Sequence, residues 1–144
     1  MISVGRIAAI ISLFLAFCLK GQSAKEDYAT LAKELQVREL STLMFAKYSD
    51  VNINKIEAFL KKHPEGPERE KALYLRAYSI WSLHRYKEAP PAYAALLKEF
   101  PKTKFSRIAR IREAAAYLFS GQPARALPRL ERDGCSAEYR GQAR

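Results

Sequence analysis

The stretch Tyr93-Ala94-Ala95-Leu96-Leu97-Lys98-Glu99-Phe100-Pro101 decides the fold, because it repeats the pattern of residues 56–64 at a spacing of 37. Apolar residues recur at the first, fourth and fifth places of both stretches, and both stretches end in Pro. The same spacing aligns further apolar and small residues along the chain, namely Leu40/Ala77/Ala114, Leu43/Ile80/Tyr117, Met44/Trp81/Leu118 and Ala89/Ala126. A fixed period of about 20 to 50 residues is typical of repeat architectures.

Each repeat is predicted to be a pair of helices. In the central repeat, Leu73, Ala77, Ile80 and Trp81 fall at helical spacing on one face. A turn at residues 84–86 follows, and the next apolar series marks a second helix. Pro ends this second helix, because the residue before Pro disfavours the helical conformation.

The pattern predicts an all-α chain with helix pairs at about residues 70–100 and 104–132. The second pair turns at residues 121–123, where Gly and Pro favour a break. Before the pairs we expect a helix near residues 53–62, and a first helix over about Lys25 to Lys47.

The repeat pattern resembles that of the tetratricopeptide (TPR) family. Its small first-helix position and its second-helix series are matched by Ala77 and Ala114, and by Tyr86, Ala89, Tyr93, Leu97 and Pro101. The resemblance implies a TPR-like α-solenoid of antiparallel helix pairs, with about two and a half repeats of period 37 within residues 25–132. The chain departs from the family pattern at Arg76 and Arg110, where the family has apolar residues. It also has no Gly in the turn before Tyr86.

The longer period and the phrase at residues 97–103 are similar to one bacterial branch of that family. The branch includes BamD-like outer-membrane assembly lipoproteins and periplasmic Tol-Pal-associated TPR proteins. The resemblance implies a protein–protein interaction scaffold with envelope proteins or acidic peptide segments as partners, in outer-membrane assembly or envelope maintenance. It implies no cofactor and no enzymatic activity.

The N-terminal segment has the pattern of a secretory signal peptide over residues 1–24. Arg6 precedes an apolar run of 13 residues, 7–19, and small and polar residues follow it. The run is shorter than the ~20 residues that span a bilayer comfortably, although an uncleaved anchor is the alternative. Residues 15–18 also resemble a bacterial lipobox, with Cys18 as the lipidated residue and Phe17 where that pattern has a small residue. Export places the protein in the periplasm or on the periplasmic face of the outer membrane.

No pattern of catalytic or metal-ligating residues is present in the sequence. His63 and His84 have no partner at metal-ligand spacing, and Cys135 has no neighbouring His or basic helix start that would activate it. Gly-rich phosphate loops and nucleophile-elbow motifs are absent. Residues 133–144 are polar and form either a solvated tail or the point where a longer repeat array is cut.

Basic residues are the strongest candidates for partner binding. The chain has 25 basic and 15 acidic residues, for a formal net charge of +10. The candidates that attract an acidic segment are Arg76, Lys104, Arg107 and Arg110. A solvated basic face is the simpler interpretation. A basic module for anionic lipid or nucleic acid is the alternative function, although export separates the protein from nucleic acid. Tyr74, Tyr78, Trp81, Tyr86 and Tyr93 are predicted core residues, of which a TPR groove can present some to a peptide.

We predict that export removes about the first two dozen residues. Intact-mass measurement of the protein from the envelope fraction tests this prediction. A mass that retains Met1 would reject cleavage, and a diacylglycerol adduct on Cys18 would establish the lipoprotein alternative.

Overall fold

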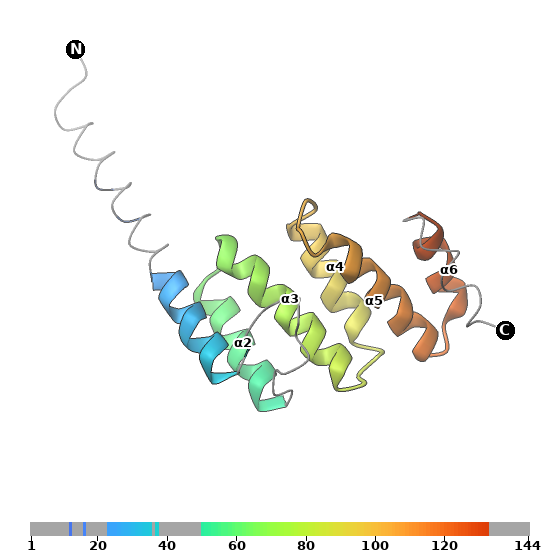
Figure 1. The fold of residues 1–144 in the computed structure, drawn as a ribbon, viewed down its shortest axis with the longest axis horizontal. Coiled ribbons are helices and arrows are strands. Elements are labelled where there is room, and N and C mark those ends of the chain that lie inside the picture. Colours follow the sequence, from blue (N-terminus) through green and yellow to red (C-terminus); the bar gives the residue numbers. More distant parts are fainter. Residues whose placement is uncertain (1–11, 13–15, 17–22, 36, 38–49, 133–144) are drawn as a thin grey trace, which may run out of the picture.

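The computed structural model describes residues 12, 16, 23–35, 37 and 50–132, and every regular element among them is a helix. The all-α prediction is therefore confirmed for this part of the chain. The helices stand side by side in a row that runs along the longest axis of the molecule (Figure 1). None of the described helices is both long and apolar enough to cross a membrane.

Five helices follow one another at short intervals after residue 50. They are α2 (Asp50–Lys62), α3 (Pro67–Ser82), α4 (Ala89–Glu99), α5 (Ser106–Phe119) and α6 (Pro123–Arg132). The two predicted pairs correspond to α3 with α4 and to α5 with α6, and the predicted single helix corresponds to α2. The predicted turn at residues 84–86 is confirmed, since it lies between α3 and α4. The predicted turn at residues 121–123 is confirmed at residues 121 and 122, whereas Pro123 already begins α6.

The first helix is shorter than predicted. Residues 23–34 are helical, Leu35 is in a turn, and Val37 has no regular structure. The amide of Val37 donates to the carbonyl of Ala32 at 2.9 Å, which closes the C-terminal end of this helix. The prediction of one helix over Lys25 to Lys47 is therefore wrong, because its apolar spacing did not reveal this end. Residues 38–49 lie outside the described part of the chain.

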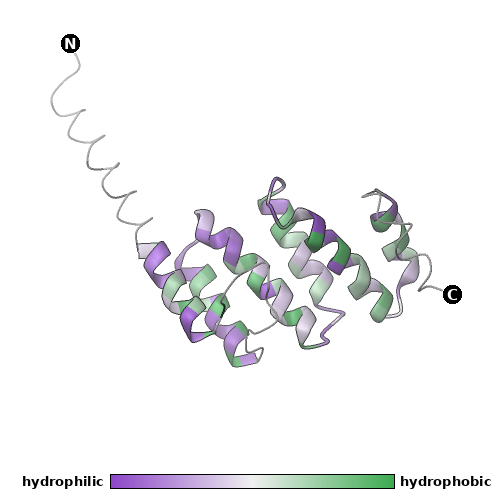
Figure 2. Cartoon of the chain, viewed as in Figure 1, coloured by the Kyte–Doolittle hydropathy of each residue, from purple (hydrophilic) through white to green (hydrophobic). Residues whose placement is uncertain are grey.

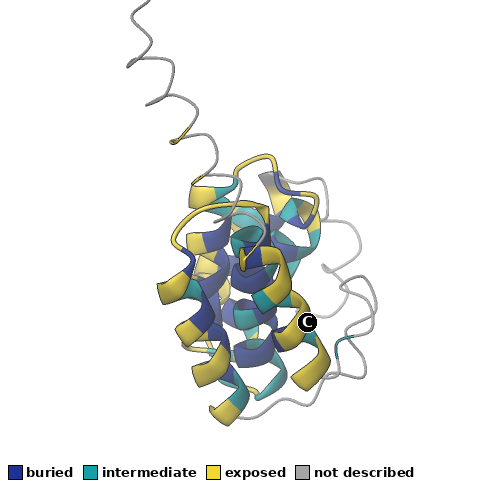
Figure 3. Ribbon diagram, turned by 90° about the vertical axis from the view of Figure 1, so that its left-hand side faces the viewer, coloured by how far each residue is buried: buried dark blue, intermediate teal, exposed yellow. Residues whose placement is uncertain are grey.

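Each helix packs on its neighbour in the chain, and α5 also touches α3. Connections of three to six residues between these helices make successive helices antiparallel. Buried residues face the interior of the row and exposed residues line its outside (Figure 3). The helix of residues 23–34 joins the same core through Leu31 and Leu35, which cluster with Ile53, Ile56 and Phe59 of α2.

Burial follows the 37-residue spacing closely. Three pairs of alanines at this spacing are 0% exposed, Ala72/Ala109, Ala77/Ala114 and Ala89/Ala126. The predicted small positions are thus fully buried, and each is occupied by an alanine methyl group. Larger residues follow the same rule, since Ile56 and Tyr93 are both 0% exposed.

The ends of α3 and α5 are built alike, 37 residues apart. After α3, the amide of His84 donates to Trp81 at 3.0 Å and that of Arg85 to Ile80 at 3.2 Å. After α5, Gly121 donates to Leu118 at 3.0 Å and Gln122 to Tyr117 at 2.8 Å. This pair of bonds is the Schellman end, which needs a left-handed residue. His84 supplies it at φ 58° and Gly121 at φ 77°.

Arg69 ties three helices together on one side of the row. Its Nη1 donates to the carbonyl of Leu60, near the end of α2, at 2.9 Å, and its guanidinium forms an ion pair with Glu99 of α4. The side chain is 19% exposed, so water screens this ion pair less than a fully exposed one. The neighbouring Glu68 and Glu70 lie in the first turn of α3, where carboxylates interact favourably with the helix dipole.

The predicted signal peptide falls mainly outside the described residues, as does Cys18. Ser23 and Ala24 belong to the first described helix, and Ala24 is 5% exposed. Cleavage after either residue would therefore remove the start of that helix. Residues 133–144 also lie outside the described part.

Exchanging the left-handed residues should change stability in opposite directions. A non-glycine residue in the left-handed conformation costs roughly 1–2 kcal/mol. His84→Gly relieves this strain but also gives the unfolded chain more conformational freedom. We expect the net effect to raise the free energy of unfolding by about 0.5–1 kcal/mol. Gly121→Ala should lower it by about 1 kcal/mol, because the added Cβ meets nothing within 4 Å and only the backbone is strained. Urea denaturation measures both, and shifts of the same sign would contradict the shared motif.

Candidate partner-binding surface

A series of stacked aromatic rings lies between α3 and α5. We call this series the aromatic ladder; its members are Phe105, Tyr74, Tyr78, Trp81, Tyr86 and Phe119. The three members on α3 are four and three residues apart, which places them on one face of the helix. Their ring centroids are 6.3 Å apart between Tyr74 and Tyr78, and 6.2 Å apart between Tyr78 and Trp81.

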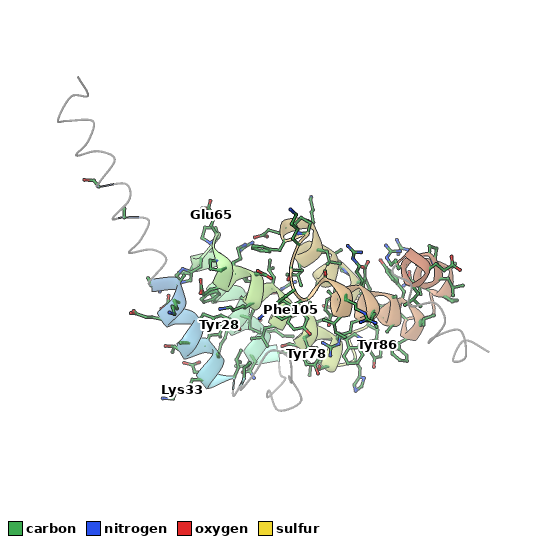
Figure 4. All side chains as sticks on the ribbon, turned by 45° about the horizontal axis from the view of Figure 1, so that its top comes forward. Tyr28, Lys33, Glu65, Tyr78, Tyr86 and Phe105 are labelled. Carbon is green, nitrogen blue, oxygen red and sulfur yellow. The ribbon has the colours of Figure 1, made fainter. Side chains whose placement is uncertain are left out.

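The ladder continues at both ends into other elements. Phe105, at the start of α5, stacks on Tyr74 with centroids 4.1 Å apart and planes 3° from parallel. At the other end Tyr86 lies edge-on to Trp81 at 6.2 Å, and it contacts Phe119 of α5 at 5.0 Å. Figure 4 labels Phe105, Tyr78 and Tyr86 along this junction. The ladder therefore joins the second half of α3 to α5 from the start of α5 to its end.

Arg112 of α5 lies against the middle of the ladder. Its guanidinium carbon is 4.0 Å from the centroid of Tyr78 and 5.5 Å from that of Trp81. Its Nη1 also donates to the hydroxyl of Tyr74 at 2.8 Å. A guanidinium can stack on a ring and donate in its own plane at once, which an ammonium cannot do. Arg112 thus connects α5 to three rungs of α3.

Tyrosine hydroxyls near this junction sit in an environment that disfavours their ionised form. Burial raises the pKa of Tyr74, and the charge and hydrogen bond of Arg112 oppose that rise. Burial raises the pKa of Tyr93 as well, with the charge of Arg112 again opposing. The hydroxyl of Tyr93 and the Nε1 of Trp81 are buried without a hydrogen-bond partner of good geometry among the described residues.

One end of the ladder is open to solvent. Phe119 is 63% exposed, while Trp81 and Tyr86 are half-buried and the adjacent His84 is exposed. The Nδ1 of His84 lies 2.5 Å from the hydroxyl of Tyr86. We call Trp81, Tyr86 and Phe119 the open end of the ladder. It combines apolar ring faces with hydroxyl and imidazole groups at its edge.

Arg76, one of the cations predicted to bind a partner, already has an acidic neighbour. Its Nε and Nη2 donate to Oε1 of Glu57 on α2 at 3.0 and 2.9 Å. Its charge also contributes to lowering the pKa of Glu88, although the larger cause is the hydrogen bond from Arg85. Arg76 therefore faces α2 and the start of α4, away from the ladder.

The other predicted cations do not gather with Arg76. At about 100° per residue, Arg107 and Arg110 point about 140° and 160° away from Arg112 around α5. They therefore lie on the side of α5 that is turned away from α3. Lys104 lies before α5 with its Nζ 5.1 Å from the ring centroid of Phe105, so it sits at the closed end of the ladder. The predicted residues thus occupy three separate places.

Arg112 was the functional candidate that spacing alone did not single out. It follows the candidate Arg110 by two residues, and its partners belong to a tyrosine and tryptophan series that was predicted to be core. The useful signal was the shared one-face spacing of Tyr74, Tyr78 and Trp81. No pattern in the sequence indicates which cation of α5 faces them, because that depends on the rotation of α5 against α3.

The two histidines make local contacts. His63 is 9% exposed, and its Nε2 lies 2.7 Å from Asp27 of the first helix. Hydrogen bonds from Lys62 and His63 hold the pKa of Asp27 below its usual value. Within the described ranges, no three His, Cys, Asp or Glu side chains lie close enough together to hold a metal ion.

Comparison with known proteins gives no relative for this chain. No family model, curated protein or solved structure matches it. The likeness to TPR proteins therefore rests on the residues quoted above.

Removing Arg112 should loosen the junction of α3 and α5. We expect Arg112→Ala to lower the free energy of unfolding by roughly 1–3 kcal/mol, since it loses ring contacts and a charged hydrogen bond. Arg112→Lys should recover less than half of the loss, because an ammonium cannot stack and donate in one plane. Arg107→Ala is the control, since this side chain is exposed. Equal effects of the two alanine variants in thermal or urea denaturation would refute the role of Arg112.

Proposed function

We propose that this protein is a TPR-like interaction scaffold that binds a segment of a partner protein at the open end of the aromatic ladder. The observation that carries the proposal is the exposure of aromatic rings at the junction of α3 and α5. These are the first helices of two consecutive pairs, so the surface between them is available only once the pairs are stacked.

The repeat geometry supports this proposal. The alanine pairs 37 residues apart share the same burial, and the two Schellman ends share the same hydrogen bonds. Helix pairs that repeat in this way form an extended surface, which suits peptides and domains better than small molecules. The TPR resemblance and the repeat geometry thus point to the same class of function.

The chemistry of the open end also supports binding to protein. Residues that dominate the free energy of protein association are most often Trp, Tyr and Arg in well-packed settings. The open end presents Trp81 and Tyr86, with Arg112 fixed directly behind them. Because Arg112 and the ladder hold these rings in place, a partner would lose little side-chain entropy of the scaffold on binding.

Location and partner follow from the N-terminal segment and the resemblance. A signal peptide would deliver the protein to the periplasm or to the periplasmic face of the outer membrane. There it would meet envelope proteins, in a complex for outer-membrane assembly or envelope maintenance. Lipidation at Cys18 would add attachment to the outer membrane.

The distribution of charge favours a second candidate, a basic module for anionic lipid. Residues 98–132 hold nine Lys and Arg against three Glu, and two of those Glu already pair with Arg69 and Arg129. α5 changes from hydrophilic to hydrophobic along its length, so the cations concentrate near its start (Figure 2). Binding of this kind to lipid or nucleic acid would weaken steeply as salt concentration rises.

The proposal predicts that Phe119→Ala reduces partner capture. Crosslinking in the producing cells, followed by mass spectrometry, should show at least a tenfold loss, about the effect of one strong interface residue. Val51→Ala is a matched control, because Val51 on α2 is 64% exposed and Phe119 is 63% exposed. Equal capture by the two variants and the unchanged protein would remove the open end from the mechanism. Capture of lipid alone would favour the second candidate.

A further inference from the structure

The last described helix pair has an apolar face that is turned away from the rest of the row. We call it the terminal face; its members are Ile111, Ala115, Leu118, Pro123 and Leu127. The first three lie four and three residues apart on α5, about 60° to 120° around the helix from Arg112, and the last two lie on α6. Ile111 and Leu118 are only partly buried where they pack against the core between α5 and α6. None of the five is buried, and Leu127 is 42% exposed.

The repeat gives each member of the terminal face a counterpart 37 residues earlier. The counterparts are Tyr74, Tyr78, Trp81, Tyr86 and Pro90. Four of them are the rungs of the ladder that α5 covers, through Phe105, Arg112 and Phe119. The fifth, Pro90, is buried. The pair α3 and α4 is therefore covered at the positions where the pair α5 and α6 offers apolar groups to solvent.

Charge distinguishes the covered pair, α3 with α4, from the pair α5 with α6. In the covered pair, Glu70 accepts a hydrogen bond from the hydroxyl of Thr103, which lies just before α5. The residue 37 places later is Arg107, which is exposed. Buried Leu73 has Arg110 as its counterpart. A helix that packs on the terminal face as α5 packs on α3 would thus meet positive charge at its start instead of a carboxylate.

We propose that the terminal face binds a helix of a partner protein that is apolar on one face and carries acidic residues at, or just before, its N-terminal end. The apolar face would cover Ile111, Leu118 and Leu127. The acidic residues would lie near Arg107. Acidic residues at that place also favour the helix that carries them, through its dipole.

Two other occupants fit the face less well. A second copy of this chain would bring its own α5 with Lys102, Lys104 and Arg107 around the helix start, so like charges would meet. Residues 133–144 carry two acidic and two basic residues and no apolar series at helical spacing. Charge therefore selects an acidic partner.

The terminal face and the open end of the ladder are formed by different residues, and Leu127 lies on α6 while Phe119 lies on α5, so they can be tested separately. A photoreactive phenylalanine analogue in place of Leu127 reports on the terminal face, and one in place of Phe119 reports on the open end. The same analogue in place of exposed Ala94 on α4 is the control for random capture. Irradiation of the producing cells, followed by sequencing of the crosslinked peptides, identifies what each position touches.

We expect the Leu127 position to crosslink to a partner segment with an apolar helical series and acidic residues at its N-terminal end. Arg107→Glu should reduce that crosslink at least fivefold without changing the melting temperature. Lys87→Glu, a charge reversal of an exposed residue in the connection between α3 and α4, should leave it unchanged.

Several results would overturn the inference. They are a crosslink to a second copy, to residues 133–144 of the same chain, to lipid only, or to a segment without acidic residues, as well as no crosslink above the Ala94 control. Insensitivity to Arg107→Glu would overturn it too. If the Phe119 position captured a partner while the Leu127 position captured none, this inference would fail and the proposed function would stand.

Discussion

Close contact at the alanine positions is the constraint on which the rest of the structure depends. Ala72, Ala77 and Ala89 are 0% exposed, and so are the alanines 37 residues after each of them. Because these methyl groups are fully enclosed, larger side chains at these positions would overpack the core at a cost of about 1–3 kcal/mol. The spacing of these alanines sets the distance and rotation of each pair, and every other contact is made within that frame.

Within this frame, the same side chains hold α3 to α5 and shape the surface beside them. Arg112 stacks on Tyr78 and donates to Tyr74, which fixes the rotation of α5. That rotation places Phe119 next to Tyr86 and turns Arg107 to the other side of the helix. Stability and surface chemistry are therefore coupled. A substitution in the middle of the ladder would also change what its open end presents.

The fold could be predicted from the sequence because its signals are local and periodic. Helix ends near Pro101 and Gly121, and the turn at His84, follow from the backbone preferences of single residues or from breaks in the apolar spacing. The first helix was predicted too long, since no Gly or Pro marks its end at Leu35. The candidate site was harder to predict, because the direction in which a cation points depends on packing between helices. Arg76 was predicted to bind an acidic partner segment but pairs with Glu57, and Arg112, which was not a candidate, contacts the ladder.

The chain changes character between the covered pair, α3 with α4, and the last described pair, α5 with α6. A repeat that only stacked copies of itself would keep Glu at the position of Glu70, and large rings at the positions of Tyr78 and Trp81. The last pair has Arg107, Ala115 and Leu118 there, so the charge is reversed and the rings are replaced by smaller groups. Smaller groups admit a closer helix, and Arg in place of Glu attracts acidic groups and repels basic ones. The face that the last described pair presents is thus suited to a helix unlike the one that covers the pair before it.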